Sequence, residues 1–257
     1  MQIKATNQYG NYSTYTLNGP GVALISVTGL NPPPADISTS PIATKDGSIF
    51  TNAQVQDRNI VLTFAITGVK PETQRTSIYF IFKVKEPISL EIKTRTRTAY
   101  IDGYVKNINA DPFNQKQQIQ ISIICPEPYF LGSEESRAIT YPSANVVTLS
   151  DCTHGAVFEI TATGSITGGF TIGNTLTGQQ FKVNGDYENG DVITLDTRLG
   201  LKALTLTRNG TTTNILQQMD STLHDWIQLV PYDNNEITLS SSNLSAVCKY
   251  QTHYEGV

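Results

Sequence analysis

Cys125-Pro126-Glu127-Pro128-Tyr129-Phe130-Leu131-Gly132 divides the 257-residue chain into two halves of different texture. The preceding run, Gln118-Ile119-Gln120-Ile121-Ser122-Ile123-Ile124, alternates polar and apolar residues as a strand does. Neither proline can donate a backbone hydrogen bond in a central strand, and each favours extended geometry in the residue before it. We therefore expect a strand to end here and a stiff, extended joint to separate residues 1–130 from residues 131–257.

The composition indicates β-structure and excludes several classes of protein. Only 16% of the residues are charged, whereas Thr, Asn, Ser and Gly are abundant, as in antiparallel sheets with a neutral polar solvent face. A net charge of -4 argues against a nucleic-acid partner, because such proteins need a basic surface to displace counterions from phosphate. No apolar run reaches the ~18 residues that span a bilayer, so we expect no membrane partner. The first residues also lack the apolar core of a secretory signal.

Cysteine usage predicts reduced thiols. Cys125, Cys152 and Cys248 are odd in number, widely spaced and free of any C-x-x-C pair. This pattern favours neither a disulfide framework nor a structural zinc site.

The first half reads as strands with one helix. The helix is expected over residues 72–82, because Pro71 precedes it and Glu72 places an acidic group in its first turn. The strands are expected at residues 22–27, 59–68, 88–92, 100–108 and 118–124, with a turn at 18–21 and a loop at 111–114. Residues 31–48, Pro-rich and then polar, are typical of a functional loop or an arm.

The second half reads as about nine short strands, which predicts a β-sandwich or jelly roll. Asn-Gly pairs at 184–185, 189–190 and 209–210 indicate tight hairpins, because type I′ turns need positive φ at both central positions. The expected strands are 157–162, 169–172, 180–183, 191–195, 203–207, 214–216, 226–230, 236–239 and 246–254.

No catalytic residue, metal ligand or cofactor site is predicted, and we do not expect an enzyme. His154, His224 and His253 lie far apart, in no known nucleophile or metal-binding spacing, and are interpreted as polar residues at strand ends. The acidic cluster Asp186, Glu188, Asp191 and Asp196 lacks EF-hand spacing and is interpreted as a solvated turn. A glycosidase with two distant carboxylates remains an open enzymatic alternative, although nothing selects a pair.

Two further features have competing interpretations. Trp226, the only tryptophan, is either a sugar-stacking platform or, as we favour, a buried or half-buried aromatic. Lys93, Arg95 and Arg97 alternate with threonines and are expected on one face of a strand. That face is either a contact surface for an acidic neighbour, such as another subunit, or a solvated face that discourages edge pairing.

Several short sequence segments, taken in order along the chain, resemble those of a known protein family. They are Arg75–Tyr79, Arg97–Val105, Gln120–Phe130, Gly190–Thr197, Trp226–Asn235 and Tyr254–Val257. Their order and spacing resemble the distal tail (Dit) protein family of phages with long, flexible, non-contractile tails.

The resemblance implies a mainly β fold in two domains. An N-terminal β-sandwich-like domain with a short helix, residues 1–130, would form a hexameric ring. A C-terminal galectin-like β-sandwich, residues 131–257, would project outward. The implied partners are further copies of the chain, the major tail tube protein, the tail-associated hub protein and receptor-binding proteins at the periphery.

The implied place is the distal end of the tail in the virion, after assembly in the host cytoplasm. Sugar binding is not implied, because the chain has no His-Asn-Arg cluster and Trp226 is followed by Ile227. The alternative function is a carbohydrate-binding module for adhesion to the host surface. The polar excursion at 31–48 and the three cations also favour a ring, since neighbouring subunits could cover them.

Overall fold

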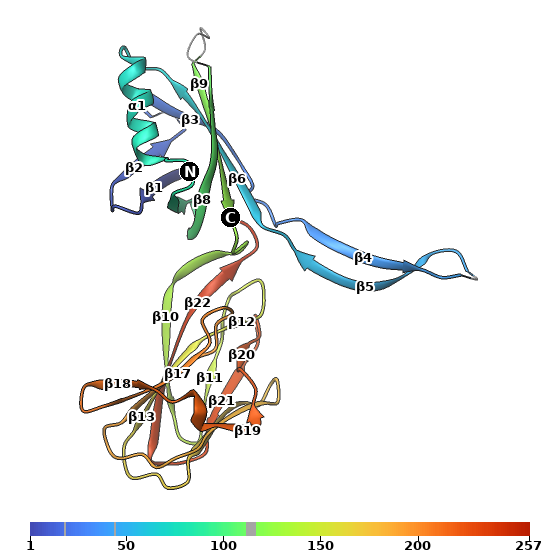
Figure 1. Ribbon diagram of the computed structural model, residues 1–257, viewed down its shortest axis with the longest axis vertical. Coiled ribbons are helices and arrows are strands. Elements are labelled where there is room, and N and C mark those ends of the chain that lie inside the picture. The colour runs from blue at the N-terminus through green and yellow to red at the C-terminus, as the bar shows by residue number, and fades with distance from the viewer. Residues whose placement is uncertain (18, 44, 112–116) are drawn as a thin grey trace. The chain divides into compact units, whose positions relative to one another are not determined.

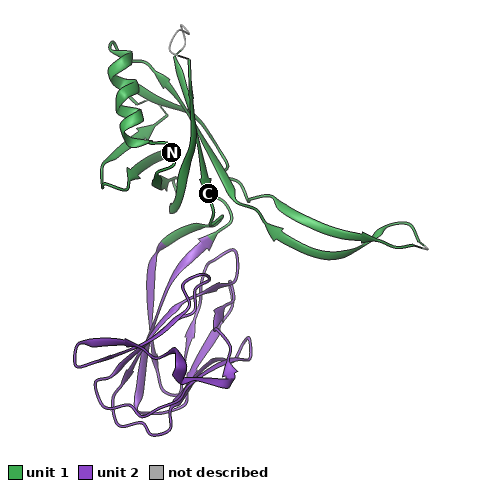
Figure 2. Cartoon of the chain, in the orientation of Figure 1, with its two compact units in different colours: residues 1–132, 254–257 green, residues 133–253 purple. Residues whose placement is uncertain are grey.

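The computed structural model describes residues 1–17, 19–43, 45–111 and 117–257. Asn18 of the expected turn and positions 112–114 of the expected loop lie outside this range. The chain is nearly all β, as predicted, and forms two compact units (Figures 1 and 2). Unit 1 comprises Met1–Gly132 and Tyr254–Val257, and unit 2 comprises Ser133–His253. The sequence placed residues 254–257 in the second domain, whereas in the structure they pack on unit 1.

Unit 1 is built on one antiparallel sheet in the order β3-β6-β9-β8-β7-β1-β2. The start of β10 (Phe130–Thr140) adds a single pairing of Leu131 with Tyr100. The main strands are β1 (Gln2–Asn7), β2 (Tyr12–Thr16), β3 (Val22–Thr28), β6 (Arg58–Ile66), β7 (Pro87–Lys93), β8 (Thr98–Ala110) and β9 (Gln118–Cys125).

Helix α1 (Pro71–Ile81) forms where the sequence predicts it and packs against one face of this sheet. It buries Ile78 and Ile81, and it contacts both β1 and β6. Three strands separate β1 from β6 in the sheet, so the sheet must curl around the helix to bring both within reach. Tyr15, Phe64 and Phe82 form an aromatic cluster beside the helix, with ring centroids 4.7 to 6.0 Å apart.

Strand alternation accounts for the core of unit 1. In β7, Ile88, Leu90 and Ile92 are buried, and the residues between them are exposed or half-buried. In β9 the same pattern buries Ile119, Ile121, Ile123 and Cys125. One face of the sheet thus supplies the core, as a period of two requires.

Residues 31–43 and 45–55 form an arm. Strands β4 (Ala35–Pro41) and β5 (Ser48–Val55) pair only with each other among the described residues, and every residue of both is exposed. Figure 2 shows this two-stranded ribbon leaving unit 1 on the side away from α1 and the β1–β2 hairpin. The sequence predicted a loop or arm at residues 31–48, and the structure shows a two-stranded hairpin whose register shifts between Ser38 and Thr39.

Unit 2 is a two-layer sandwich. One sheet has the order β18-β17-β16-β13-β22-β10, the other β11-β21-β14-β15-β19, and β12 and β20 form a small third ladder. The strands are β11 (Ser143–Val146), β12 (His154–Gly155), β13 (Val157–Ala162), β14 (Phe170–Asn174), β15 (Gln179–Val183), β16 (Val192–Asp196), β17 (Ala203–Arg208), β18 (Thr211–Asn214), β19 (Met219–His224), β20 (Gln228–Leu229), β21 (Asn235–Leu239) and β22 (Leu244–Tyr254). A short 3-10 helix, Leu216–Gln218, precedes β19.

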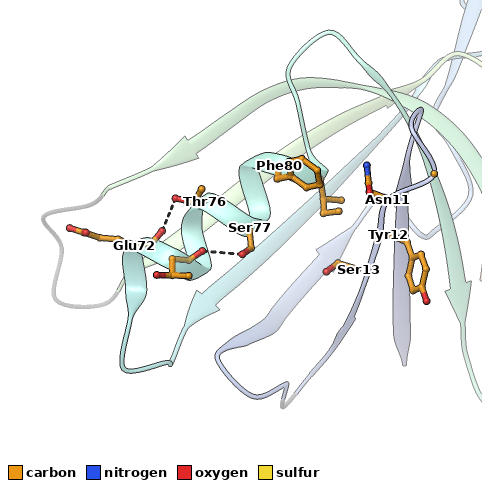
Figure 3. Close-up of a pocket in the computed structure, with 10 residues that line it drawn as sticks. Asn11, Tyr12, Ser13, Glu72, Thr76, Ser77 and Phe80 are labelled. Atoms are coloured by element: carbon orange, nitrogen blue, oxygen red, sulfur yellow. Dashed lines mark hydrogen bonds between the residues drawn. The ribbon is translucent and has the colours of Figure 1, made fainter.

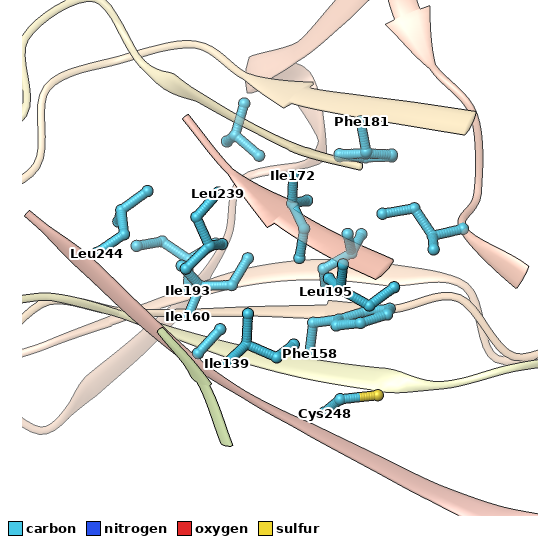
Figure 4. Close-up of a cluster of buried hydrophobic side chains, with 14 of the residues drawn as sticks. Ile139, Phe158, Ile160, Ile172, Phe181, Ile193, Leu195, Leu239, Leu244 and Cys248 are labelled. Atoms are coloured by element: carbon cyan, nitrogen blue, oxygen red, sulfur yellow. The ribbon is translucent and has the colours of Figure 1, made fainter. Parts of the chain in front are cut away.

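The two sheets of unit 2 meet through their inward-facing side chains (Figure 4). Phe158 and Ile193 from the first sheet join Ile172 and Phe181 from the second in one buried cluster. Alternate residues of the strands in both sheets therefore form the core of the sandwich, as the short alternating runs predicted.

The Asn-Gly turns behave differently from one another. Asn209 (φ 50°) and Gly210 (φ 77°) join β17 to β18 in a tight hairpin, as predicted. Gly185 and Gly190 also have positive φ, but β15 and β16, which flank them, do not pair with each other. The prediction of hairpins at 184–185 and 189–190 was therefore wrong, because each strand finds its partners elsewhere in the sandwich.

Candidate assembly surfaces

The run Lys93–Arg97 is a hairpin turn and not a strand face. Strand β7 ends at Lys93, and Thr94 accepts hydrogen bonds on Oγ1 from the backbone N–H of Thr96 and of Arg97. Arg95 therefore lies in the turn, and the predicted alternation of the three cations on one strand face was wrong. The Thr94 hydroxyl competes with strand pairing here, which is common for Thr near turns.

All three cations are exposed in the single chain. Arg97 donates to the carbonyl of Gly256 at 3.3 Å, and its guanidinium lies 4.3 Å from the Tyr254 ring centroid. A role for Lys93, Arg95 and Arg97 between subunits stays a prediction.

The arm has one apolar face. Directly opposed residues on paired strands share a face, and the register opposes Ile37 to Ala53 and Thr39 to Phe50. The apolar face thus contains Ala35, Ile37, Thr39, Pro41, Phe50, Ala53 and Val55. The opposite face contains mainly polar residues together with Ile49. Ile37 is 67% exposed and Phe50 63%, which is unusual for a large apolar pair on a soluble surface.

A groove of about 890 Å³ lies between α1 and the β1–β2 hairpin (Figure 3). Phe80, 53% exposed, provides its large apolar surface, whereas the ring of Tyr12 lies on the outer face of β2, where the ammonium of Lys4 is 4.6 Å from its centroid. The hydroxyls of Thr76 and Ser77 donate to carbonyls one turn earlier in the helix, those of Glu72 and Thr73. These hydroxyl donors are therefore already satisfied, and this wall of the groove is less polar than its composition indicates.

Asn7 holds the two walls of this groove together. Its Oδ1 accepts from the backbone N–H of Tyr9 and of Asn11, which shapes the β1–β2 turn. Its Nδ2 donates to the carbonyl of Phe80 at the end of α1 at 3.4 Å. The side chain is 5% exposed, so these bonds form largely away from solvent.

Arg58 is a buried cation that gathers several segments of unit 1. It is 2% exposed, and its three nitrogens donate to four backbone carbonyls at 2.6 to 2.7 Å. The acceptors are Gly29 and Asn31 at the base of the arm, Pro128 in the expected joint, and Glu255 in the last residues of the chain. The guanidinium also lies over the ring of Phe130. Burial lowers the pKa of Arg58 from its ordinary value.

The expected joint at 125–132 is accordingly packed and not free. Cys125 is fully buried, and burial raises the pKa of its thiol to about 12. Phe130 is also fully buried in the core of unit 1. The chain passes between the units twice, at 132–133 and at 253–254. The expected stiffness of the joint stays a prediction.

In unit 2, Trp226 is half-buried, as favoured from the sequence. It packs against Phe181 with ring centroids 5.2 Å apart, and Lys202 places its ammonium 5.1 Å from the indole centroid. The indole is thus engaged by neighbours and does not stand clear as a sugar-stacking platform would.

His154 and His253 are brought together although their spacing in sequence gave no sign of it. Their rings stack with centroids 4.6 Å apart. His154 contacts the hydroxyl of Thr148 through Nε2 and the carbonyl of Gly155 through Nδ1. Burial lowers the pKa of His154 to about 4 and also lowers that of His253. His154 begins strand β12 and His224 ends β19, as expected, but His154 is buried whereas His224 is exposed.

The acidic cluster is only partly a solvated turn. Asp191 is 3% exposed and receives two hydrogen bonds from Arg208, at 2.8 and 2.5 Å, and one from the backbone of Glu188. The Arg208 guanidinium lowers the pKa of Asp191 from its ordinary value. Asp191 therefore has a structural role between turns, whereas Glu188 is exposed as predicted.

Within the described ranges, no group of three or more His, Cys, Asp or Glu side chains is placed to hold a metal ion. No helix among the same residues is both long enough and apolar enough to span a membrane.

Comparisons with known proteins agree with this architecture. Residues 150–254 match the family model described as siphovirus-type tail component, C-terminal domain. No curated protein matches the chain in sequence. The crystal structure of the Dit protein of SPP1 shares the fold with a TM-score of 0.72 and 16% identity, over 97% of this chain and 98% of that one. A chain of the phage P2 baseplate, in its activated conformation with Ca, aligns with a TM-score of 0.55 and 11% identity, over 100% and 99% of the two chains.

These matches cover the two halves in different ways. The family match lies in unit 2, whereas the fold similarity runs through both units. Residues 150–254 therefore match the siphovirus-type tail component family, and the resemblance of the chain to distal tail proteins is confirmed in that segment and in the fold.

Proposed function

We propose that this tail component forms a hexameric ring in a phage tail tip or baseplate. In this proposal unit 1 builds the ring, which joins the tail tube on one side to the hub protein on the other. Unit 2 is the peripheral, galectin-like β-sandwich. It provides a binding surface for receptor-binding proteins. The protein acts by positioning its neighbours in the virion and has no enzymatic role.

The exposed apolar face of the arm supports this proposal most strongly. A two-stranded hairpin is marginally stable in water and needs further packing on an apolar face. Burying a Phe or an Ile side chain stabilises a protein by about 1.5–3 kcal/mol each. A single chain with both side chains exposed lacks this stabilisation. An assembly of copies would cover this face. The similarity to SPP1 Dit, whose structure is presented as a hub adsorption apparatus in Gram-positive-infecting phages, points the same way.

Mass measurement by light scattering tests the ring. We expect a species with about six times the 28.1 kDa mass of the chain, stable on dilution through the micromolar range. A monomer at every concentration, both alone and with the tail tube protein added, would contradict the proposal. Glycan binding by such a monomer would favour the carbohydrate-binding alternative, and the half-buried state of Trp226 gives that alternative no support.

A further inference from the structure

We propose that Asn209 is a site of covalent modification, at which the side-chain amide is lost through ring closure onto the backbone nitrogen of Gly210. That nitrogen attacks Cγ of Asn209, a new C–N bond forms, and the Cγ–Nδ2 bond breaks with release of ammonia. Water then opens the five-membered imide at either of its two carbonyls, which leaves an aspartate or an isoaspartate. Water is the only co-reactant, and no second copy of the chain is needed.

The tip of the β17–β18 hairpin leaves both reacting groups free. Asn209 and Gly210 are exposed. Among the described residues, the side chain of Asn209 and the N–H of Gly210 make no hydrogen bond. The space beside Gly210 is open, since a Cβ added there would meet no atom within 4 Å. Neither a hydrogen bond nor a neighbouring side chain therefore has to be displaced before the nitrogen approaches Cγ.

The hairpin is also built to open locally. Asn209 has φ 50° in the closed turn, and ring closure needs a rotation about the bond between its Cα and its carbonyl carbon. Strand β18 lies at the edge of its sheet, pairs only with β17 among the described residues, and has all four of its residues exposed. Short, solvent-exposed edge elements open at a low free-energy cost. The rotation therefore does not require the core of the sandwich to unfold.

Two further Asn-Gly pairs of unit 2 are held by the fold. At 189–190, the N–H of Gly190 donates to the carbonyl of Ala162 at 2.9 Å, so the attacking nitrogen is already engaged. At 184–185, Asn184 is half-buried, and its Nδ2 donates to the carboxylate of Asp220 at 3.3 Å. Ring closure at either pair must first break these bonds. The same dipeptide should therefore react at different rates, and fastest at Asn209.

The modification would alter the charge at this edge of unit 2. Arg208, directly before the site, donates to the buried carboxylate of Asp191. A carboxylate at position 209 places a second anion next to that arginine in the sequence. An isoaspartate also adds a methylene to the backbone of a two-residue turn, whose geometry is matched to the twist of its strands. Both products therefore act on the hairpin that carries Arg208.

Peptide mass spectrometry of the full chain, incubated at pH 8.5 and 37 °C, tests the site. Digestion with pepsin at acidic pH stops the reaction, and amide loss is then followed at positions 184, 189 and 209. The matched control is the same chain incubated in guanidinium chloride, where the fold no longer holds Asn184 or Gly190. Asn209→Gln is incubated in parallel, because a glutamine cannot form the five-membered ring.

In the folded chain we expect Asn209 to lose its amide at least fivefold faster than Asn184 and Asn189, with both aspartate and isoaspartate produced. In guanidinium chloride this preference should disappear. Equal rates in the folded chain, or faster loss at Asn184 or Asn189, would overturn the inference. Aspartate without isoaspartate at position 209 would contradict ring closure. Amide loss from the same peptide of Asn209→Gln at the parent rate would contradict the assignment to Asn209.

Discussion

The guanidinium of Arg58 lies 4.3 Å from the ring centroid of Phe130, and both side chains are buried in unit 1. Arg58 begins strand β6, directly after the arm, while Phe130 begins β10, which leads into unit 2. The pair therefore joins the base of the arm to the first crossing between the units. Arg58 also donates a hydrogen bond to the carbonyl of Glu255, which lies in the last segment of the chain, after the second crossing.

Replacing Arg58 should loosen all of these segments together. Arg58→Lys keeps the charge but cannot reach four carbonyls, so buried acceptors are left unpaired and unit 1 should lose about 3 kcal/mol of unfolding free energy. Hydrogen exchange should show the amide of Val257, which donates to Leu30, losing protection. Arg95→Lys, in the exposed turn, is the matched control and should change little. Unaltered protection of Val257 in Arg58→Lys would show that the cation does not hold this segment.

The stacked histidines predict a pH dependence for unit 2. His154 binds a proton near pH 6.5 when unfolded but only near pH 4 when folded. As the pH falls from 6.5 toward 4, the unfolded state takes up the proton first, so the free energy of unfolding should fall by about 3 kcal/mol. The depressed pKa of His253 acts in the same direction.

Denaturant unfolding followed by Trp226 fluorescence between pH 4.5 and 7.5 measures this effect, because the tryptophan lies in the same unit as both histidines. His154→Gln should flatten the dependence, even if it lowers stability at neutral pH. His224→Gln, an exposed histidine in unit 2, should keep the slope of the parent chain. If the free energy of unfolding of His154→Gln depended on pH as steeply as that of the parent chain, the pH dependence could not be assigned to His154.

The Asp191–Arg208 pair should stabilise unit 2 through its two charge-assisted hydrogen bonds. Asp191→Asn removes the charge and one good acceptor from a buried position, and we expect a loss of about 2 kcal/mol in thermal or denaturant unfolding. Glu188→Gln changes an exposed acid in the same turn and should cost less than about 0.5 kcal/mol. Equal losses in the two variants would show that the burial of Asp191 is unimportant.

The two faces of the arm should differ in their effect on assembly. Phe50→Asp places a charge on the apolar face and should raise the dissociation constant between copies at least tenfold. Ile49→Asp introduces the same charge on the opposite face of the same strand and should leave assembly near that of the parent chain. Sedimentation velocity over a concentration series measures both. The account of the arm fails if the two variants dissociate alike.

Local patterns predicted much of the fold. Pro71 and Glu72 located α1, alternation located β7 and β9, and the turn at Asn209 was right because its strands are neighbours in both sequence and sheet. Such features depend on a few adjacent residues. The sequence phrases also indicated the family, which the match over residues 150–254 supports.

The features that were missed depend on partners distant in sequence. Arg58 was not singled out from the sequence, because its acceptors include a carbonyl almost 200 positions away. The stack of His154 on His253 joins residues 99 positions apart. The exposure of Phe80 in the groove was not predicted, because Phe80 stands between Ile78 and Ile81, which are both buried. For the arm, a signal was available in Ile37, Ile49 and Phe50, which are apolar residues set in a polar segment.

Electron microscopy of the purified full-length chain, with end-on views averaged without imposed symmetry, tests the central claim most directly. The account predicts closed rings of six copies, and it predicts that Phe50→Asp abolishes them while Ile49→Asp retains them. Single particles of one copy, or rings that persist unchanged in Phe50→Asp, would contradict it.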